Sequence, residues 1–217
     1  MKKIYLIITL LFLILGCDEI KKEEKMENLE KELKEYKPFN EQEKRDKELI
    51  LQWLQNGDKI FTRENKVAHI TVSAWIVNAN RDKVLMVYHN IYDSWAWLGG
   101  HADGNKNLRE VVLKEVEEES GVKEVKFLST DIFSIEILTV AGHEKRGEYI
   151  SSHLHLNFTF LLEVDEKMNL QIKSDENSGV EWIKVDEISK KSSEKWFVER
   201  IYSKLCRKVK ENLGEVI

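Results

Sequence analysis

The feature that most constrains this chain is the segment WLGGHADGNKNLREVVLKEVEEESGV, at residues 97–122. A pair of glycines and a polar loop stand directly before a stretch with helical periodicity, which Gly121 is placed to end. Glu115, Glu118 and Glu119 have the spacing i, i+3 and i+4, so one helical turn projects three carboxylates from one face. Like charges at this spacing repel by roughly a few tenths of a kcal/mol per pair. The pattern therefore predicts a cation that compensates them.

The predicted cofactor is Mg²⁺ or Mn²⁺, because hard divalent ions prefer carboxylate oxygens whereas zinc favours His and Cys. The predicted metal ligands are Glu115, Glu118 and Glu119, with Gly100 supplying a main-chain carbonyl where the glycine pair bends the backbone towards the ligand. A metal beside a phosphate polarises it and lowers the pKa of bound water, and a nearby glutamate accepts the proton. This chemistry is metal-assisted hydrolysis of a phosphoanhydride. The alternative is a solvated acidic helix face, which leaves the glycines unexplained.

The surrounding pattern indicates strands on both sides of this helix. AHITVSAWIV (68–77) and KVLMVYH (83–89) alternate as strands, and a glycine loop follows before the helix. Further strands are predicted at 122–129, 133–140, 152–164 and 179–185, and a last helix is predicted from Glu187 to a stop at Gly214, with Asp186 as its N-cap. Residues 27–55 are helical in pattern, interrupted at Pro38. The predicted class is α/β (α+β), with helices on a sheet.

The segment resembles the signature of the Nudix hydrolase family. Laid on the sequence from Gly100, the signature matches Glu115, apolar Val116, Glu118, Glu119, Gly121 and apolar Val122, and the resemblance covers roughly residues 67–206. It implies an α/β/α sandwich with a mixed β-sheet. It also implies hydrolysis of a nucleoside diphosphate linked to another moiety, a small-molecule nucleotide-type substrate. The implied catalytic residues are Glu118, Glu115 and the residue at the arginine position, Lys114.

Two positions depart from the signature. Lys106 stands where the family has its first glutamate, and Lys114 stands where it has arginine. Those positions normally form an ion pair, which two lysines cannot make, so Glu110 is predicted as a substitute partner of Lys114. Lysine lacks the planar fork of arginine, and reduced activity is expected. The alternatives are a nucleotide-binding module with weakened catalysis, and an isoprenoid-diphosphate isomerase. The isomerase would need a cleft cysteine, whereas Cys206 is predicted to be a buried structural thiol.

Substrate contacts are predicted at three histidines. In SHLHLNFTF the polar and apolar residues alternate, so His153 and His155 share a face, and His101 follows the glycine pair. The alternative for these residues is an ordinary polar sheet face or loop surface. Trp95 and Trp97 are expected to pack in the core rather than to stack on a base. Lys145 and Arg146 are either exposed loop charges or contacts to a terminal phosphate, and the sequence leaves this open.

The chain begins with MKKIYLIITLLFLILGC, which has the layout of an export signal: a basic start, a short apolar run and Gly16-Cys17. Its end resembles a bacterial lipobox, which predicts lipidation of Cys17 and a membrane-anchored lipoprotein. An uncleaved anchor is an alternative; if translation starts at Met26, the protein is instead cytoplasmic.

The predicted organisation is a signal at 1–17, a charged linker and helical extension at 18–66, the catalytic domain at 67–206, and the end of the last helix with a C-terminal tail at 207–217. The net charge of −5 argues against a protein that coats nucleic acid. Membrane contact is predicted only through the lipid, and the sequence does not indicate an oligomeric state.

Overall fold

The computed structural model describes residues 28–55, 57–145 and 147–213. The chain divides into two compact units, one ending at Tyr36 and the other beginning at Lys37. In the first unit, residues 28–35 form a helix. In the second unit, helix α2 (Glu41–Leu54) follows Asn40, whose side chain caps it by accepting a hydrogen bond from the Glu43 amide.

The second unit is built on a mixed sheet, which has eight strands among the described residues. Its path runs β10-β2-β1-β9-β5, with β3 paired to β2, β4 to β1 and β6 to β9. The long central pair β1 and β9 is parallel, with His69 beside His155 and Val77 beside Glu163. The strands are β1 (Ala68–Val77), β2 (Lys83–His89), β3 (Ser94–Ala96), β4 (Leu98–His101), β5 (Lys126–Phe127), β6 (Ser134–Val140), β9 (His153–Glu163) and β10 (Asn177–Lys184).

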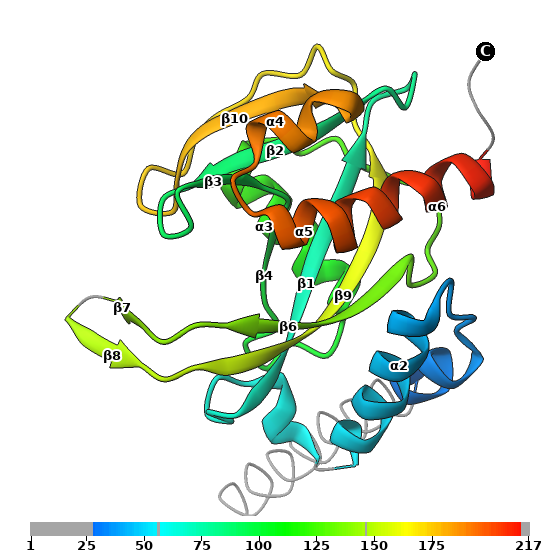
Figure 1. Cartoon of the computed structure of the whole chain (residues 1–217), viewed down its shortest axis with the longest axis vertical. Coiled ribbons are helices and arrows are strands. Elements are labelled where there is room, and N and C mark those ends of the chain that lie inside the picture. The colour runs from blue at the N-terminus through cyan, green and yellow to red at the C-terminus, as the bar shows by residue number, and fades with distance from the viewer. Residues whose placement is uncertain (1–27, 56, 146, 214–217) are drawn as a thin grey trace, which may run out of the picture. The chain divides into compact units, whose positions relative to one another are not determined.

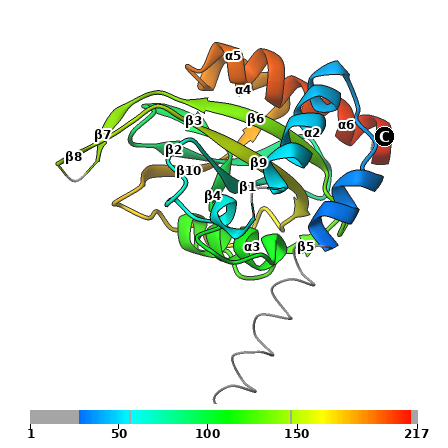
Figure 2. The same ribbon diagram turned by 90° about the horizontal axis from the view of Figure 1, so that it is seen from below.

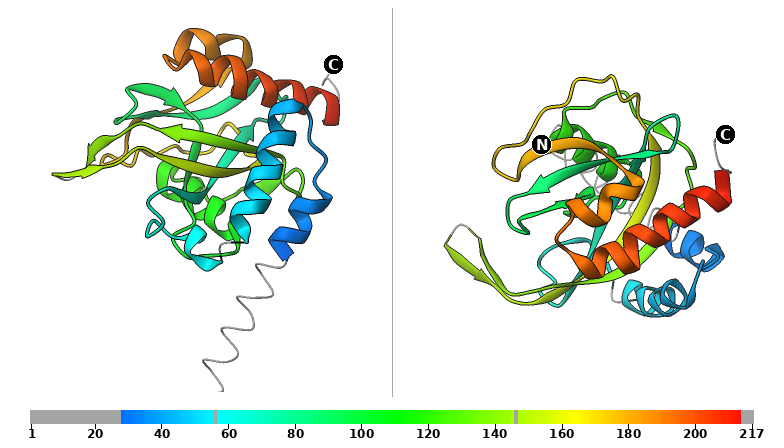
Figure 3. Two further views of the ribbon diagram at one scale, coloured as in Figure 1. Left: turned by 60° about the horizontal axis from the view of Figure 1, so that its bottom comes forward. Right: turned by 45° about the horizontal axis from the view of Figure 1, so that its top comes forward.

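Helices cover both faces of this sheet. Figure 2 shows α3 (Leu108–Ser120) on one face and the C-terminal helical segment on the other, with the strands between them. That segment comprises η2 (Val185–Glu187), α4 (Ile188–Lys191), α5 (Lys195–Phe197), η3 (Val198–Tyr202) and α6 (Ser203–Leu213). The predicted sandwich of helices on a mixed sheet is confirmed (Figures 1 and 3). A short turn, η1 (Asp58–Phe61), precedes β1.

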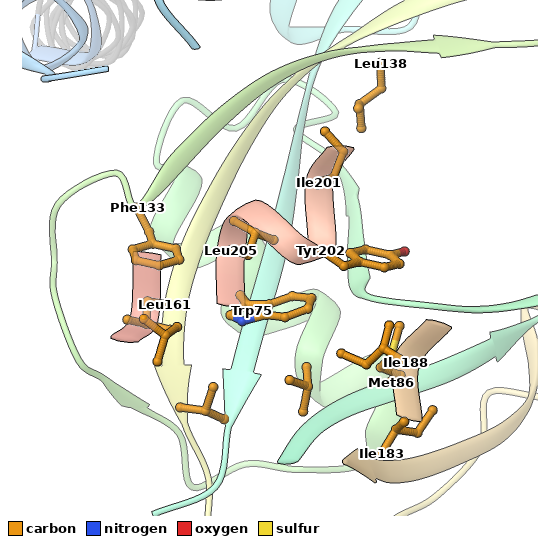
Figure 4. Close-up of a cluster of buried hydrophobic side chains, with 13 residues drawn as sticks. Trp75, Met86, Phe133, Leu138, Leu161, Ile183, Ile188, Ile201, Tyr202 and Leu205 are labelled. Atoms are coloured by element: carbon orange, nitrogen blue, oxygen red, sulfur yellow. The ribbon is translucent and has the colours of Figure 1, made fainter. Parts of the chain in front are cut away.

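The main hydrophobic core lies between the sheet and the C-terminal helices. Figure 4 shows Trp75 of β1 facing Tyr202 and Leu205, and the Trp75 and Tyr202 rings stack with centroids 5.6 Å apart. All three side chains are fully buried. Burial of a large side chain of this kind stabilises the fold by about 1.5–3 kcal/mol, so this contact fixes the C-terminal segment on the sheet.

Towards α2, the same sheet face becomes polar. Lys204 of α6 is fully buried and its Nζ contacts carboxylate oxygens of Glu136 at 2.9 Å and Glu43 at 3.2 Å, while Lys208 Nζ lies 2.8 Å from Glu43. The Ser134 hydroxyl lies within hydrogen-bond distance of both glutamates, 2.8 Å from Glu43 and 2.5 Å from Glu136, and shares its one proton between them. Each buried charge therefore has a partner of opposite sign, which is the condition under which burial of a charge is tolerated.

The structure differs from the predicted elements in several places, and the strand predicted at 122–129 is only β5, Lys126–Phe127. The predicted glycine loop before α3 is strand β4, paired with β1 from Thr71↔His101 to Ala74↔Leu98. The predicted continuous last helix is broken at residues 192–194, and Asp186 lies inside η2 rather than capping a helix. A hairpin of β7 (His143–Lys145) and β8 (Glu148–Ile150) projects beyond the sheet (Figure 1). The sequence did not predict this hairpin, because its strands are only three residues long and polar residues near 146 interrupt the alternation.

Candidate functional site: carboxylates on α3 and a histidine cluster on β1, β4 and β9

The C-terminal half of α3 places Glu119 against the backbone of β4. The helix ends at Gly121, which adopts the left-handed conformation at φ 74° and donates its amide hydrogen to the Glu117 carbonyl at 2.8 Å. Glu119 is 3% exposed, and its Oε2 accepts a hydrogen bond from the Gly99 amide at 2.9 Å. Burial raises the pKa of the Glu119 carboxyl to about 8, and the Gly99 hydrogen bond opposes the rise. Without a cation, the buried carboxyl of Glu119 is therefore mostly protonated at neutral pH. A cation bound beside it would favour the ionised carboxylate.

The glycine pair is required because other atoms approach its Cα positions, not because the chain bends there. A Cβ on Gly99 would lie 2.2 Å from the Val72 carbonyl oxygen, and one on Gly100 would lie 2.4 Å from the carboxyl carbon of Glu115. Any side chain at Gly100 would therefore displace the Glu115 carboxylate. Burial raises the pKa of Glu115, and the positive charge of Lys114 counteracts this. The predicted bend is corrected to a close packing of strand and helix.

Glu118 differs from its two neighbours because it is exposed and already paired. Its Oε1 lies 3.1 Å from Lys114 Nζ, and its Oε2 lies 3.0 Å from Lys173 Nζ in the loop before β10. Hydrogen bonds from Lys173 and Lys114 lower the pKa of Glu118, so it is ionised at neutral pH. Lys173 also pairs with Glu176 at 3.1 Å. The predicted substitute pair between Lys114 and Glu110 is wrong: Lys114 reaches along the helix to Glu118, and Glu110 accepts a hydrogen bond from Asn105.

Lys106, the other departure from the signature, has its own partner. Its side chain is 4% exposed, and Nζ lies 2.5 Å from Asp58 Oδ1 in η1. The ammonium also lies 5.7 Å from the centre of the Phe61 ring. Lys106 therefore ties the loop before α3 to η1, a contact that the sequence did not predict.

The three predicted histidines come together, and a fourth joins them. Ring centroids lie 5.1 Å apart for His69 and His101, 5.1 Å for His69 and His155, and 4.9 Å for His101 and His155. His153 lies 4.9 Å from His69. Burial lowers the pKa of His155 far below its usual range, and the neighbouring His101 lowers it further; burial also lowers the pKa of His69. His69 was missed because nothing local distinguishes it from the other polar residues of its strand.

These histidines and Glu115 lie on opposite faces of the sheet. Gly100 pairs with Val72 and faces Glu115, whereas His101 pairs with the next residue, Thr71. Side chains alternate along strands, and paired residues share a face. Thr71 and His69 therefore point away from α3, as does His155, the strand partner of His69. Among the described residues, His69, His101 and His155 are the one set of three potential metal ligands within 4.8 Å of one another. The three glutamates do not form such a set in this conformation.

The remaining sequence predictions have plain outcomes. Trp95 and Trp97 pack against the main core, as expected, and Trp97 meets Tyr202 edge to face at 5.7 Å. Cys206 lines a cavity of about 450 Å³ bordered by Arg81 and Lys184, and burial raises the pKa of its thiol to about 11. It is therefore a poor nucleophile, which argues against the isomerase.

In the described part of the chain no helix has the length and hydropathy to cross a bilayer. The leader with Cys17, and Arg146, lie outside the described residues.

Known proteins resemble this chain in both sequence and structure. The family model described as NUDIX domain matches residues 67–205. A Caenorhabditis elegans Ap4A hydrolase binary complex is 16% identical, with coverage of 65% of this chain and 95% of that chain and a TM-score of 0.47. A NUDIX family hydrolase from Clostridium perfringens is 20% identical, with coverage of 63% and 95% and a TM-score of 0.45. The dihydroneopterin triphosphate pyrophosphohydrolase of E. coli is 12% identical, with coverage of 62% and 94% and a TM-score of 0.45. The search of curated proteins gave no match.

Proposed function

From the premise that this chain belongs to the NUDIX domain family, we propose that it is a Mg²⁺- or Mn²⁺-dependent hydrolase. Its substrate would be a nucleoside diphosphate linked to another moiety, and the bond cleaved would be the phosphoanhydride. The observation that carries the proposal is the position of Glu115 and Glu119 against the glycine pair, with Glu118 exposed beside them.

The donor set fits a hard divalent cation. Three carboxylates are offered from one turn of α3, and the space beside Glu115 exists only because residue 100 has no Cβ. Glu119, with its raised pKa, is stabilised as a carboxylate only when positive charge comes close. Glu115, Glu118 and Glu119 would hold the ion, together with the Gly100 carbonyl. When bound, the ion would polarise a phosphoryl oxygen and supply charge stabilisation.

Residues around the metal site would accept the proton of the attacking water, contact the phosphate and position the ligands. Glu118 is ionised and exposed, so it is placed to accept the proton of the attacking water, with Glu115 beside it. Lys114 and Lys173 bring positive charge to the same point, where they can contact phosphate oxygens once Glu118 is engaged elsewhere. Gly99 holds Glu119 through its amide and so fixes the end of α3 to β4. The substrate contacts predicted from the sequence, His101, His153 and His155, lie on the sheet face opposite Glu115, and no step of this mechanism uses them.

One observation favours a second candidate, a nucleotide-binding module with weakened catalysis. Both oxygens of Glu118 are occupied by lysines, so a metal must displace them or share the carboxylate. Displacement of surface ion pairs costs about 0–1 kcal/mol each, which would weaken metal binding but not prevent it. The geometry therefore supports a slower hydrolase over an inactive one.

The deciding experiment measures phosphate release from a panel of nucleoside diphosphate derivatives with Mg²⁺ or Mn²⁺. Wild type is expected to turn over at least one substrate, and Glu118→Gln to lose about 100-fold or more of this turnover. The matched control is Glu117→Gln, an adjacent exposed residue that pairs with Lys123 and should keep full activity. Nucleotide binding without turnover would support the binding module instead. Equal activity of Glu118→Gln and wild type would remove α3 from the mechanism.

The N-terminal leader is proposed to carry a lipid on Cys17, which would anchor the hydrolase to a membrane. Mass spectrometry of the native N-terminus tests this directly. A lipidated Cys17 supports the anchor, and an unmodified chain beginning at Met26 contradicts it.

A further inference from the structure

The histidine cluster contains a buried ring nitrogen that has no hydrogen-bond partner among the described residues. His69 is 5% exposed, and its Nδ1 lies 3.1 Å from the carbonyl oxygen of Asn65. A carbonyl can only accept a hydrogen bond, so Nδ1 carries the proton and Nε2 presents a lone pair. That Nε2 is buried and has no hydrogen-bond partner among the described residues. A buried acceptor without a partner is costly, which points to a ligand that accepts the lone pair.

His153 has the same arrangement. Its Nδ1 lies 2.8 Å from the Ser151 carbonyl oxygen, and its Nε2 lies 3.2 Å from Nε2 of His155. A histidine whose outer nitrogen donates to a backbone carbonyl while the inner nitrogen offers its lone pair is the arrangement found in metal sites. Backbone carbonyls thus orient the rings of His69 and His153, and His153 in turn contacts His155.

The cluster lies where β1, β4 and β9 meet, with His69 buried and the rings of His101, His153 and His155 half-buried. Imidazoles at centroid distances of about 5 Å cannot all be protonated, because like charges so close repel strongly. A neutral group of imidazoles has little attraction for a phosphate but is the preferred ligand set of zinc, cobalt and nickel. Mg²⁺ prefers oxygen and would not compete for it.

We propose that His69, His101 and His155 form a second metal centre, which binds one Zn²⁺-like transition-metal ion on the sheet face opposite Glu115. One ligand nitrogen from each lies within 4.8 Å of the others. Tetrahedral zinc at Zn–N distances of about 2.0–2.1 Å requires nitrogens about 3.4 Å apart, so small rotations of the rings close the site. The three residues come from β1, β4 and β9, whose pairing fixes their backbones.

The test uses the full-length protein, freed of metal by chelation and titrated with Zn²⁺ in the presence of excess Mg²⁺. Equilibrium dialysis should give one bound Zn²⁺ per chain, and Co²⁺ should give the intense visible absorption of a tetrahedral nitrogen site. Substitutions His69→Ala, His101→Ala and His155→Gln should each weaken Zn²⁺ binding by more than about 100-fold, since even an outer partner of a ligand is worth 10–100-fold. The matched control is His89→Ala on β2, outside the cluster, which should change nothing.

The glutamate variants separate this proposal from the hydrolase. Glu118→Gln and Glu119→Gln should leave Zn²⁺ stoichiometry unchanged while turnover falls. The proposal is overturned if wild type binds no stoichiometric Zn²⁺, if the Co²⁺ spectrum is the weak one of an octahedral oxygen site, or if Zn²⁺ binding follows the glutamates and not the histidines. If a histidine variant fails to fold, the stoichiometry and the Co²⁺ spectrum of wild type still decide.

Discussion

The two faces of β1 and β4 carry two different kinds of polar cluster. Towards α3, carboxylates from one short sequence segment gather at a glycine pair, and two lysines neutralise the exposed one. On the opposite face, histidine rings from three strands meet, and His69 Nε2 has no partner among the described residues. The difference lies in the ligand chemistry. Anionic oxygens suit hard ions and phosphate chemistry, whereas neutral nitrogens suit borderline metals.

The largest effect on the free energy of unfolding is expected from the buried ion cluster on the histidine-bearing face, where Lys204 pairs with two glutamates. Lys204→Met keeps the length of the side chain but leaves Glu43 and Glu136 without the ammonium that lies 3.2 and 2.9 Å from them. Removal of one partner from a buried ion cluster costs about 3–5 kcal/mol, because the remaining charges stay desolvated. Urea unfolding measures this loss, with exposed Lys210→Met on the same helix as the control. A loss below about 1 kcal/mol would mean that the polar residues of this face are not held by charge pairing.

A second substitution separates the two clusters. Gly100→Ala would place a methyl group 2.4 Å from the carboxyl carbon of Glu115, so the carboxylate must move. We expect divalent-dependent turnover to fall by about 100-fold, equivalent to roughly 2.7 kcal/mol, while Zn²⁺ binding by the histidines persists. Gly104→Ala is the control, since its Cβ would meet only the Thr62 methyl at 3.9 Å and its positive φ affects stability alone. If Gly100→Ala lost both turnover and Zn²⁺ binding, the two faces would form a single site.

The sequence predicted the glutamate cluster and not the histidine cluster, for a physical reason. Glu115, Glu118 and Glu119 lie on one helix, so their shared face follows from spacing alone. His69 and His155 are 86 positions apart and meet through the parallel register of β1 and β9, and no local pattern specifies a parallel register. Strand β4 was predicted as a loop because glycine disfavours strands. Here close approach by Val72 and Glu115 requires glycine inside one.

The pH dependence of metal binding tests the desolvated member of the glutamate cluster. Burial raises the pKa of Glu119 from 4.5 to about 8, so without metal the protonated form is favoured in the folded state. This group stabilises the metal-free fold fully below about pH 4.5, and the contribution is lost as pH rises to about 8. Below pH 8, Mg²⁺ must displace the proton of Glu119 in order to bind. The stabilisation by Mg²⁺ should therefore shrink by up to about 1.4 kcal/mol for each unit by which the pH falls below 8.

Thermal melts with and without Mg²⁺ between pH 6 and 9 measure this dependence. The Mg²⁺-induced rise in Tm should fall by up to about 3–6 °C for each pH unit below 8. Glu119→Gln should remove the dependence, because its amide carries no titrating proton. A Tm increment that is flat with pH in wild type would exclude Glu119 as a ligand. The same Mg²⁺ additions should leave the histidine cluster unaffected.

The smallest effect concerns the lysines that occupy Glu118. Lys173→Met removes one of the two ammonium groups paired with this carboxylate, at 3.0 Å, and frees its Oε2 for a cation. A partly exposed pair is worth about 0–1 kcal/mol, so the apparent affinity for Mg²⁺ should rise by up to about fivefold. Mg²⁺ titration of turnover measures it, with Lys126→Met, which breaks the pair with Glu163 on β9, as the control. If affinity falls instead, Lys173 orients Glu118 towards the metal. The glutamate cluster then resembles the histidine cluster in having its ligands fixed by neighbouring groups.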